Sequence, residues 1–500
     1  MYIEIFFGKA AQCFIAFFSC SVYICAPMLQ LSSGQHHRPK LTSHLTQTMV
    51  TFTAHRGKPE LVTPARVTPS ETKTLSDMDD HYGHRVYIPL VEFFRCRPTD
   101  GRHGQPEDPA VAVKAALAEA LVHYYPVAGR MQETANGKLV VDCTGEGVSF
   151  VEADAAVRLE ELGTPLLPPY PCVEELLPDA GNIQVVAGKP IVAVQVTRFL
   201  GGGFAIGLQI SHCIADGFGM IQFLKAIADM ARGQSAPTAL PVWERHLLMA
   251  REPPDTAYVQ QKLMSLLKNA TGETPPSMVY RHFFFGPAEV SVLRSHVPGD
   301  LGASCTRFEL LTAAIWRCRA AVWGFNDDHR AVLAFSANVR RRWEHIPRGY
   351  YGNALVYHVV DAAAGELRRS PLSHAVALIR DAKTDMSDEH VRSTADFMAS
   401  MRGHYGRGCG GGDQPPMVYD EAAYMVSDWT RLGEDDVDFG WAERVGGGVA
   451  MPSSHVSFNG TCRNSDGDEL VVASMLLPEG VVERFEKEVA LLLKQEADSY

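Results

Sequence analysis

The sequence predicts a two-domain protein of mixed α/β (α+β) structure. Its 500 residues exceed what one hydrophobic core usually organises, and 46% of them are hydrophobic, which is enough for two cores. Strand-like and helix-like patterns alternate in both halves, and residues 233–278 have the proline-containing, mixed polar composition of a linker. We therefore expect an N-terminal domain over 49–232, a crossover linker over 233–278 and a C-terminal domain over 279–500.

The first 48 residues differ from the rest of the chain. From Ala10 to Leu31 the sequence is largely apolar, as in a signal peptide or a marginal membrane anchor. Glu4 precedes this run, however, and cysteines and serines dilute it. We interpret residues 1–48 as a removable leader or a start-site artefact, with Met49 as the working start and a membrane anchor as the alternative.

Charge and cysteine usage restrict the class of protein. A formal net charge of −12 argues against nucleic-acid binding, which needs a basic face toward the phosphates. The eleven cysteines form no Cys-x-x-Cys pair and no Cys/His cluster with zinc-ligand spacing, so we expect neither a metal site nor a disulfide framework. We expect a cytoplasmic monomer with reduced cysteines and no stable membrane association.

A helix opens the regular structure of the first half. Asp108 is a typical N-cap and Pro109 a typical first helical residue. Leu117, Leu121 and Tyr124 follow at spacings of four and three, which places them on one helix face. Proline and glycine within the next residues end the helix.

Strand patterns follow this helix. Lys138–Cys143 and Val148–Glu152 predict a hairpin around a turn at 144–147. Ile191–Phe199 and Phe204–Ser211 predict two further strands, joined by a run of three glycines. An amphipathic helix is then expected from near Phe218 to the glycine at 233, so residues 211–219 form a strand-to-helix junction.

The second half repeats this mixture of strands and helices. Strands are expected at Val279–Phe285, Ala331–Val339 and Glu469–Leu477. Helices are expected through Phe308–Trp316 and at Val481–Leu493.

The junction carries the main candidate for catalysis, His212, with Asp216 four residues later. A thioester is already activated, so acyl transfer from it needs only a base, and a neutral imidazole with a pKa of about 6.5 suits this role. Asp216 either orients the ring or turns away and holds the junction. The same spacing at His296 lies in a polar loop, and we interpret it as coincidence. Cys213 is not expected to pair with His212, because strand neighbours point to opposite faces.

Other catalytic patterns are missing from the sequence. There is no Gly-x-Ser-x-Gly elbow of a serine hydrolase, no His-Glu-x-x-His zinc motif and no P-loop lysine motif. The candidates therefore reduce to the His212 junction.

A second motif lies more than two hundred residues downstream, at 438–442. Its sequence, Asp-Phe-Gly-Trp-Ala, nearly repeats the Asp-Phe-Gly-Trp-Gly signature of the plant BAHD acyltransferases, and with His212 upstream the chain resembles this family from Met49 to its C-terminus. Further family-like blocks are Tyr125–Arg130, Asn338–Arg340, Gly349–Asn353 and Ser427–Leu432. Residues 60–65, 71–80 and 141–148 are similar to the benzyl alcohol O-benzoyltransferase branch.

The resemblance implies a fold and a set of roles. It implies two chloramphenicol acetyltransferase-like domains with an active-site channel between them, which coenzyme A and the acceptor enter from opposite ends. His212 would be the general base in the middle of this channel. Asp216 would be an orienting residue that turns from the channel and pairs with Arg340. Trp429 matches a position that lines the acceptor pocket, and Phe218 is expected as a wall near His212.

The downstream motif is implied to be structural and near the coenzyme side, with the residues Asp438, Phe439, Gly440 and Trp441. Ala442 and Glu443 depart from the family, which has glycine and commonly a basic residue there. If position 442 needs a positive φ, alanine costs about 1 kcal/mol, which affects loop geometry rather than chemistry.

The expected function is transfer of an acyl group from acyl-CoA to an alcohol hydroxyl, without a covalent acyl-enzyme. Benzoyl is the first candidate for the acyl group, and acetyl and hydroxycinnamoyl are the others. Acyl-CoA would be a co-substrate, with no bound cofactor. Two alternatives stay open: an N-acyltransferase acting on an amine, as in spermidine- or tyramine-directed relatives, and a non-catalytic acyl-CoA-binding relative.

Overall fold

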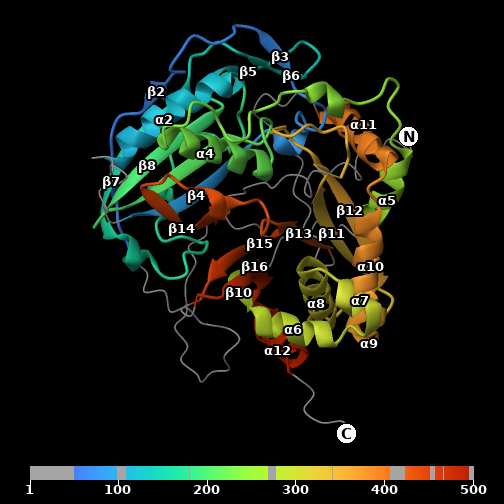
Figure 1. Cartoon of the computed structure of the whole chain (residues 1–500). Coiled ribbons are helices and arrows are strands. Elements are labelled where there is room, and N and C mark those ends of the chain that lie inside the picture. The colour runs from blue at the N-terminus through green and yellow to red at the C-terminus, as the bar shows by residue number, and fades with distance from the viewer. Residues whose placement is uncertain are drawn as a thin grey trace.

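The described residues form two large β-sheets with helices packed against them, and a small three-stranded sheet lies beside the first of these (Figure 1). The computed structural model describes residues 50–97, 108–179, 181–268, 277–340, 342–405, 423–450, 456–464 and 467–494. Residues 1–48, which we interpret as a leader or a start-site artefact, lie outside the described residues. No helix in these ranges is long and apolar enough to cross a membrane.

The first sheet has the order β1-β7-β8-β9-β4-β14, and β2 also pairs with β7. Its strands are β1 (Ala54–Arg56), β2 (Glu60–Val62), β4 (Tyr87–Cys96), β7 (Val148–Arg158), β8 (Val192–Leu200), β9 (Gly203–Ser211) and β14 (Ala442–Val449). The second sheet has the order β10-β16-β15-β13-β11-β12. Its strands are β10 (Met278–Phe285), β11 (Arg330–Asn338), β12 (Leu355–Ala363), β13 (Ala423–Asp428), β15 (Val456–Arg463) and β16 (Glu469–Pro478). The small sheet contains β3 (Thr72–Thr74), β6 (Leu139–Asp142) and β5 (Arg130–Glu133).

The helices connect and cover these sheets. The α-helices are α2 (Pro109–His123), α3 (Val173–Leu176), α4 (Gly217–Ala231), α5 (Ala257–Lys268), α6 (Pro287–Ser295), α7 (Gly299–Ser304), α8 (Arg307–Val322), α9 (Ala364–Arg369), α10 (Leu372–Thr384), α11 (Asp388–Tyr405) and α12 (Val482–Leu492). Short 3-10 helices are η1 (Tyr82–His84), η2 (Tyr125–Ala128), η3 (Leu159–Leu162), η4 (Arg245–Leu248), η5 (Glu434–Asp436) and η6 (Glu479–Val481).

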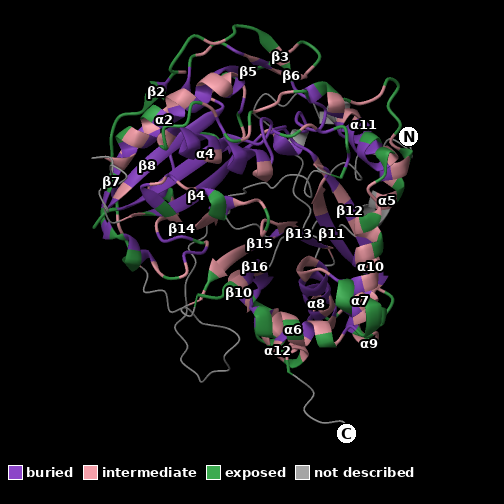
Figure 2. Cartoon of the chain, viewed as in Figure 1, coloured by how far each residue is buried: buried purple, intermediate pink, exposed green. Residues whose placement is uncertain are grey.

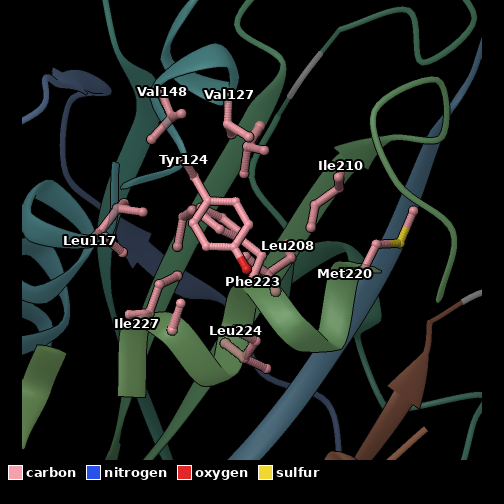
Figure 3. Packing of buried hydrophobic residues seen from close by; sticks show 14 of the residues in the cluster. Leu117, Tyr124, Val127, Val148, Leu208, Ile210, Met220, Phe223, Leu224 and Ile227 are labelled. Carbon is pink, nitrogen blue, oxygen red and sulfur yellow. The ribbon is translucent and has the colours of Figure 1, made fainter. Parts of the chain in front are cut away.

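Helices α2 and α4 pack against each other and against the first sheet. Asp108 caps α2 by accepting a hydrogen bond from the Ala110 N–H, as its sequence predicts. The predicted inner face of this helix is fully buried, and the ring of Tyr124, the C-cap of α2, lies 5.0 Å from the Phe223 ring of α4 (Figure 3). This packing fixes the start of α4, and with it the junction that carries His212.

The second sheet is covered on both faces. One apolar cluster joins it to α6, α8, α10 and α12, and another joins its opposite face to α5 and α11. Figure 2 shows buried and intermediate residues mixed along the strands of the second sheet, and exposed residues mainly on the outer helices and loops. The predicted strands and helices of the second half are confirmed, with shifts of one residue at some strand ends. The predicted linker region contains η4 and α5, and α5 packs on the second sheet.

One strand connects the two halves of the sequence. β14 comes from the second half but pairs antiparallel with β4 of the first sheet, with Ala442 opposite Cys96 and Val449 opposite Leu90. Its glycine-rich sequence carries little strand signal, so this crossing was not predicted. The crossing brings the segment before β14 against the first core.

The predicted hairpin of 138–143 with 148–152 is wrong. β6 pairs with β5 and β3, whereas β7 pairs with β1, β2 and β8. Both edges of the start of β7 are already occupied, because Phe150 lies opposite Glu60 of β2 on one side and Val194 of β8 on the other. Apolar alternation identifies a strand but does not select its partner.

Candidate active site

The strand-to-helix junction opens into a cavity between the two sheets. β9 ends at Ser211, His212 follows it, and α4 begins at Gly217. The residues that line the cavity come from both halves of the chain: Ile88, His212, Asp216, Gly217, Phe218, Met220, Ser336, Asn338, Leu355, Tyr357, Met425, Ser427, Asp428, Trp429, Leu432, Val449 and Phe458. Most of these side chains are apolar, and several are aromatic.

His212 is held from several directions. Its N–H donates to the Val86 carbonyl at 2.8 Å, and its carbonyl accepts from Asn353 Nδ2 at 2.8 Å. Its ring stacks on the ring of His84, with centroids 4.1 Å apart and planes 10° apart. Only 8% of the residue is exposed, yet it lines the cavity. The main chain of His212 is therefore fixed by hydrogen bonds, and its imidazole is held at the cavity wall by the stacked ring of His84.

The surroundings of His212 favour its neutral form. Burial lowers the pKa of His212 below its ordinary 6.5, and this exceeds the opposing effects of its own carbonyl, the Asp216 charge, Asn353 and Asp79. Burial also lowers the pKa of the stacked His84 well below its ordinary value. Two neutral imidazoles thus lie face to face, and the one at the cavity is ready to accept a proton.

Asp216 is occupied by the scaffold. It is fully buried, and its Oδ2 accepts from Arg340 Nη1 at 2.7 Å and from the Ala354 N–H at 3.1 Å. Its Oδ1 accepts from Arg340 Nη2 at 3.1 Å and from the Gly219 N–H at 2.9 Å, which caps α4. With four hydrogen bonds from the protein, this carboxylate holds the start of the helix to the loop that precedes β12.

Trp429 and Phe218 line the same cavity as His212. Trp429 follows β13, and its indole N–H donates to Ser427 Oγ at 3.1 Å. The Phe218 ring lies 4.8 Å from the guanidinium of Arg340. The structure therefore brings His212, Asp216, Phe218 and Trp429 together around one cavity, and Arg340 contacts two of them without lining it.

Phe439, Trp441 and Ala442 of the downstream motif lie in the first core, and no residue of the motif lines the cavity. Phe439 is fully buried with its ring 5.1 Å from Phe94, and Trp441 stacks on Phe204 at 5.4 Å. Asp438 accepts from Arg97 Nη1 at 2.8 Å. These contacts attach the start of β14 to β4 and β9.

The strain considered for Ala442 is not found. Ala442 is a buried residue of β14 and has no positive φ, whereas Gly440 has a φ of 79°. Glycine is therefore needed two residues earlier in this motif, and alanine at 442 costs no backbone strain.

Comparison with known proteins decides the family. The sequence model of the Transferase family matches residues 48–492, which is most of the chain. The chain belongs to this family, the BAHD acyltransferases.

Curated relatives of this BAHD acyltransferase cover nearly its whole length. It is 47% identical to Acyl transferase 1 of Oryza sativa subsp. japonica, over 90% of this chain and 98% of the relative. It is 42% identical to Benzyl alcohol O-benzoyltransferase of Petunia hybrida, over 89% and 95% of the two chains. It is also 42% identical to Spermidine hydroxycinnamoyltransferase 1 of Oryza sativa subsp. japonica, over 83% and 94%.

Solved structures confirm the fold of the BAHD acyltransferase. Vinorine synthase superposes with a TM-score of 0.63 at 22% identity, over 88% of this chain and 98% of that one. F. sporotrichioides TRI101, complexed with coenzyme A and T-2, gives a TM-score of 0.63 at 17% identity, over 84% and 97%. The predicted two-domain mixed fold is thereby confirmed.

Much of the wall of the BAHD acyltransferase cavity consists of residues that the sequence does not mark as functional. Ile88 of β4 and Val449 of β14 come from one sheet, and Ser336, Tyr357 and Phe458 come from the other. Ser336 offers a local signal, because it is a polar residue within an apolar strand. The sequence does not mark His84 either, although its ring contacts the candidate base. In the described residues, no group of three or more His, Cys, Asp or Glu side chains has the arrangement of a metal site.

Proposed function

We propose that this acyltransferase moves an acyl group from acyl-CoA to an alcohol hydroxyl, with His212 as general base. The observation that supports this most directly is the His212 imidazole at the wall of an otherwise mostly apolar cavity, where burial lowers its pKa. Coenzyme A as the carrier is supported by the TRI101 complex, which has the same fold. No bound cofactor is part of the proposal.

The reaction needs one proton transfer in each direction. His212 takes the proton of the hydroxyl while the oxygen attacks the thioester carbonyl, so that a carbon–oxygen bond forms. The carbon–sulfur bond then breaks, and the thiolate sulfur of coenzyme A takes the proton from the imidazolium. Asp216 is an orienting residue here, because Arg340 and two main-chain N–H groups occupy its oxygens.

A covalent intermediate on Cys213 is disfavoured. Its Sγ lies 3.1 Å from the His84 carbonyl, to which the thiol donates, and the residue is fully buried. Burial raises the pKa of the Cys213 thiol far above its usual range, so the nucleophilic thiolate is not available. Transfer without an acyl-enzyme is the proposal that fits this site.

Benzoyl is the proposed acyl group, and benzyl alcohol or a small aliphatic alcohol is the proposed acceptor. Phe218, Tyr357, Trp429 and Phe458 give the cavity an aromatic lining that suits an aromatic acyl group. The benzyl alcohol O-benzoyltransferase relative supports the same choice.

An amine acceptor is the second candidate. Asp428 lines the cavity, so its carboxylate could attract a cationic amine, although burial raises its pKa and it accepts from Thr430 Oγ1 at 2.9 Å. The spermidine hydroxycinnamoyltransferase relative is as similar as the benzoyltransferase. Hydroxycinnamoyl and acetyl are the alternative acyl groups, and they are tested together with benzoyl. A cytoplasmic location and a monomeric state stay predictions.

A matrix of donors and acceptors tests the proposed function. Benzoyl-, acetyl- and hydroxycinnamoyl-CoA are each combined with benzyl alcohol, a short aliphatic alcohol, spermidine and tyramine, and product and free thiol are measured. We expect benzyl benzoate with the highest kcat/KM and one thiol released for each ester. Faster formation of an amide than of an ester would reject the alcohol acceptor in favour of an amine. Binding of acyl-CoA without product would indicate a non-catalytic relative.

The pH dependence of kcat/KM gives an independent prediction. The base acts only when neutral, so activity is lost as the pH falls through the pKa of His212. Because burial places this pKa below 6.5, we expect kcat/KM to reach its plateau by about neutral pH. Initial rates between pH 4.5 and 8, in buffers in which the enzyme stays folded, measure this limb. A limb centred above 6.5 would contradict the assignment.

A further inference from the structure

A second buried carboxylate, Asp79, is linked to the junction through hydrogen bonds. Asp79 is fully buried in the segment between β3 and η1. Its Oδ2 accepts from the N–H and the hydroxyl of Ser76, at 3.1 and 2.6 Å. Its Oδ1 accepts from Arg245 Nη1 at 2.7 Å, and from the N–H and Nδ2 of Asn353 at 2.8 and 3.0 Å. Both oxygens are therefore fully used, and three chain segments meet at this residue.

Two partners of Asp79 extend to the peptide that carries the base. Asn353 Nδ2 donates at 2.8 Å to the carbonyl of His212 itself. Arg245 Nη2 donates at 2.9 Å to the carbonyl of Ile214, two residues on. Asn353 thus donates from one amide nitrogen to both Asp79 and the junction, whereas Arg245 uses one terminal nitrogen for each.

The arginine of this network is fixed by its surroundings. The Arg245 side chain is 1% exposed, and its guanidinium lies 4.4 Å from the Trp243 ring centroid and 4.8 Å from that of Tyr351. A Cβ on Gly352 would come within 1.6 Å of Arg245 Nη1, so glycine is needed there. These contacts keep the guanidinium beside the junction.

The network is separate from the pair formed by Asp216 and Arg340, although both end on the same loop. Asn353 belongs to the first and Ala354, which donates to Asp216, to the second. The charged and titratable groups around His212 include Asp79 with Arg245, Asp216 with Arg340, the imidazoles of His84 and His81, the neighbouring thiol of Cys213, and Asp428 and Tyr357 on the cavity wall.

We propose that Asp79 is a positioning residue for acyl transfer, which fixes the main chain of His212 through Asn353 and Arg245. The inference rests on His212 being the base of the proposed function. It gives a role to two sequence blocks, 71–80 and 349–353, that indicate only family resemblance when read from sequence. Asp79 is absent from the lining of the cavity, so it acts through the residues that it holds.

A positioning role has two measurable consequences. A base displaced by about 1 Å from its reactive geometry can cost on the order of a hundredfold in rate, with binding of substrates little changed. The negative charge of Asp79 also raises the pKa of His212, in opposition to burial. Loss of that charge leaves Arg245 uncompensated next to the junction, which lowers the pKa of His212 further.

The variant Asp79→Asn tests both consequences, because it removes the charge and keeps the shape. We expect kcat to fall by about ten- to a hundredfold with KM changed less than about twofold. We expect the acidic limb of kcat/KM to move to lower pH. A residue with only a structural role would lower the yield or Tm without moving this limb.

Asp80→Asn is the matched control. Asp80 is also fully buried, pairs with Arg85 Nη2 at 2.8 Å and accepts from the Leu139 N–H at 2.9 Å. The Asp80→Asn variant therefore also loses a buried carboxylate that is paired with an arginine, one residue away from Asp79. We expect a lower Tm in this variant, with the pH limb where the wild type has it.

Asn353→Ala cuts the link to His212 and leaves the pair of Asp79 with Arg245 in place. It decides the matter if Asp79→Asn does not fold, and we expect the same tenfold or larger loss of kcat. A kcat equal to that of the wild type in Asn353→Ala would overturn the positioning role. So would a folded Asp79→Asn variant with the kcat of the wild type and an unmoved acidic limb of kcat/KM. Wild type and His212→Ala are assayed alongside. An inactive wild type, or an active His212→Ala variant, would instead reject the proposed function.

Discussion

Replacing His212 with alanine is expected to remove measurable acyl transfer, while the protein still folds and binds coenzyme A. A positioned general base contributes about 10²- to 10⁴-fold to a rate, and no other described imidazole both lines the cavity and lies on the β9–α4 junction. Rates are measured with several acyl-CoA donors, and binding is measured by calorimetry. Turnover close to that of the wild type with any donor would reject the mechanism.

The chain supplies its own control for this substitution. His296 begins the same His-x-x-x-Asp spacing, but it caps the C-terminus of α6, and its Nε2 lies 2.9 Å from the Leu492 carbonyl. His296→Ala should therefore leave kcat unchanged. A matching loss of activity in both variants would point to a general effect of histidine removal on the fold.

Local signals were sufficient for the elements that position the base. The cap at Asp108, the glycines between β8 and β9, and the apolar spacing of α4 each act within a few residues, and the predicted elements are confirmed. The hairpin failed for the opposite reason, since its outcome depends on β2 and β8, which compete for β7 from elsewhere in the sequence. Partner choice is a tertiary property, and a strand pattern does not contain it.

The residues of the site also divide into those with a local sequence signal and those that depend on the tertiary structure. His212 was found because a strand, a glycine turn and a helix surround it in sequence, and because a family motif lies downstream. Asp79 and Asn353 gave no comparable signal, since a buried aspartate looks like a surface one until its partners are known. The wall residues Ile88 and Tyr357 are ordinary strand residues whose cavity position depends on how the two sheets meet. No single segment of the sequence therefore determines which acyl group and which acceptor the cavity takes.

Replacing Asp216 with alanine is expected to reduce stability together with activity. Arg340 is 8% exposed at its side chain and would remain buried without its carboxylate, which typically costs about 3–5 kcal/mol. The N-cap of α4 would be lost as well, at about 1 kcal/mol. Soluble yield and Tm should fall in parallel with kcat.

Two comparisons separate this structural role from a chemical one. The double variant Asp216→Ala/Arg340→Met removes the lone buried charge, so it should regain part of the Tm that the single variant loses. If Asp216 only supports the junction, activity per folded molecule should recover along with stability. A single variant with the Tm of the wild type and no transfer would instead show that the carboxylate takes part in the reaction. The four hydrogen bonds that occupy its oxygens favour the first result, because they leave the carboxylate fixed to the scaffold rather than directed at the imidazole.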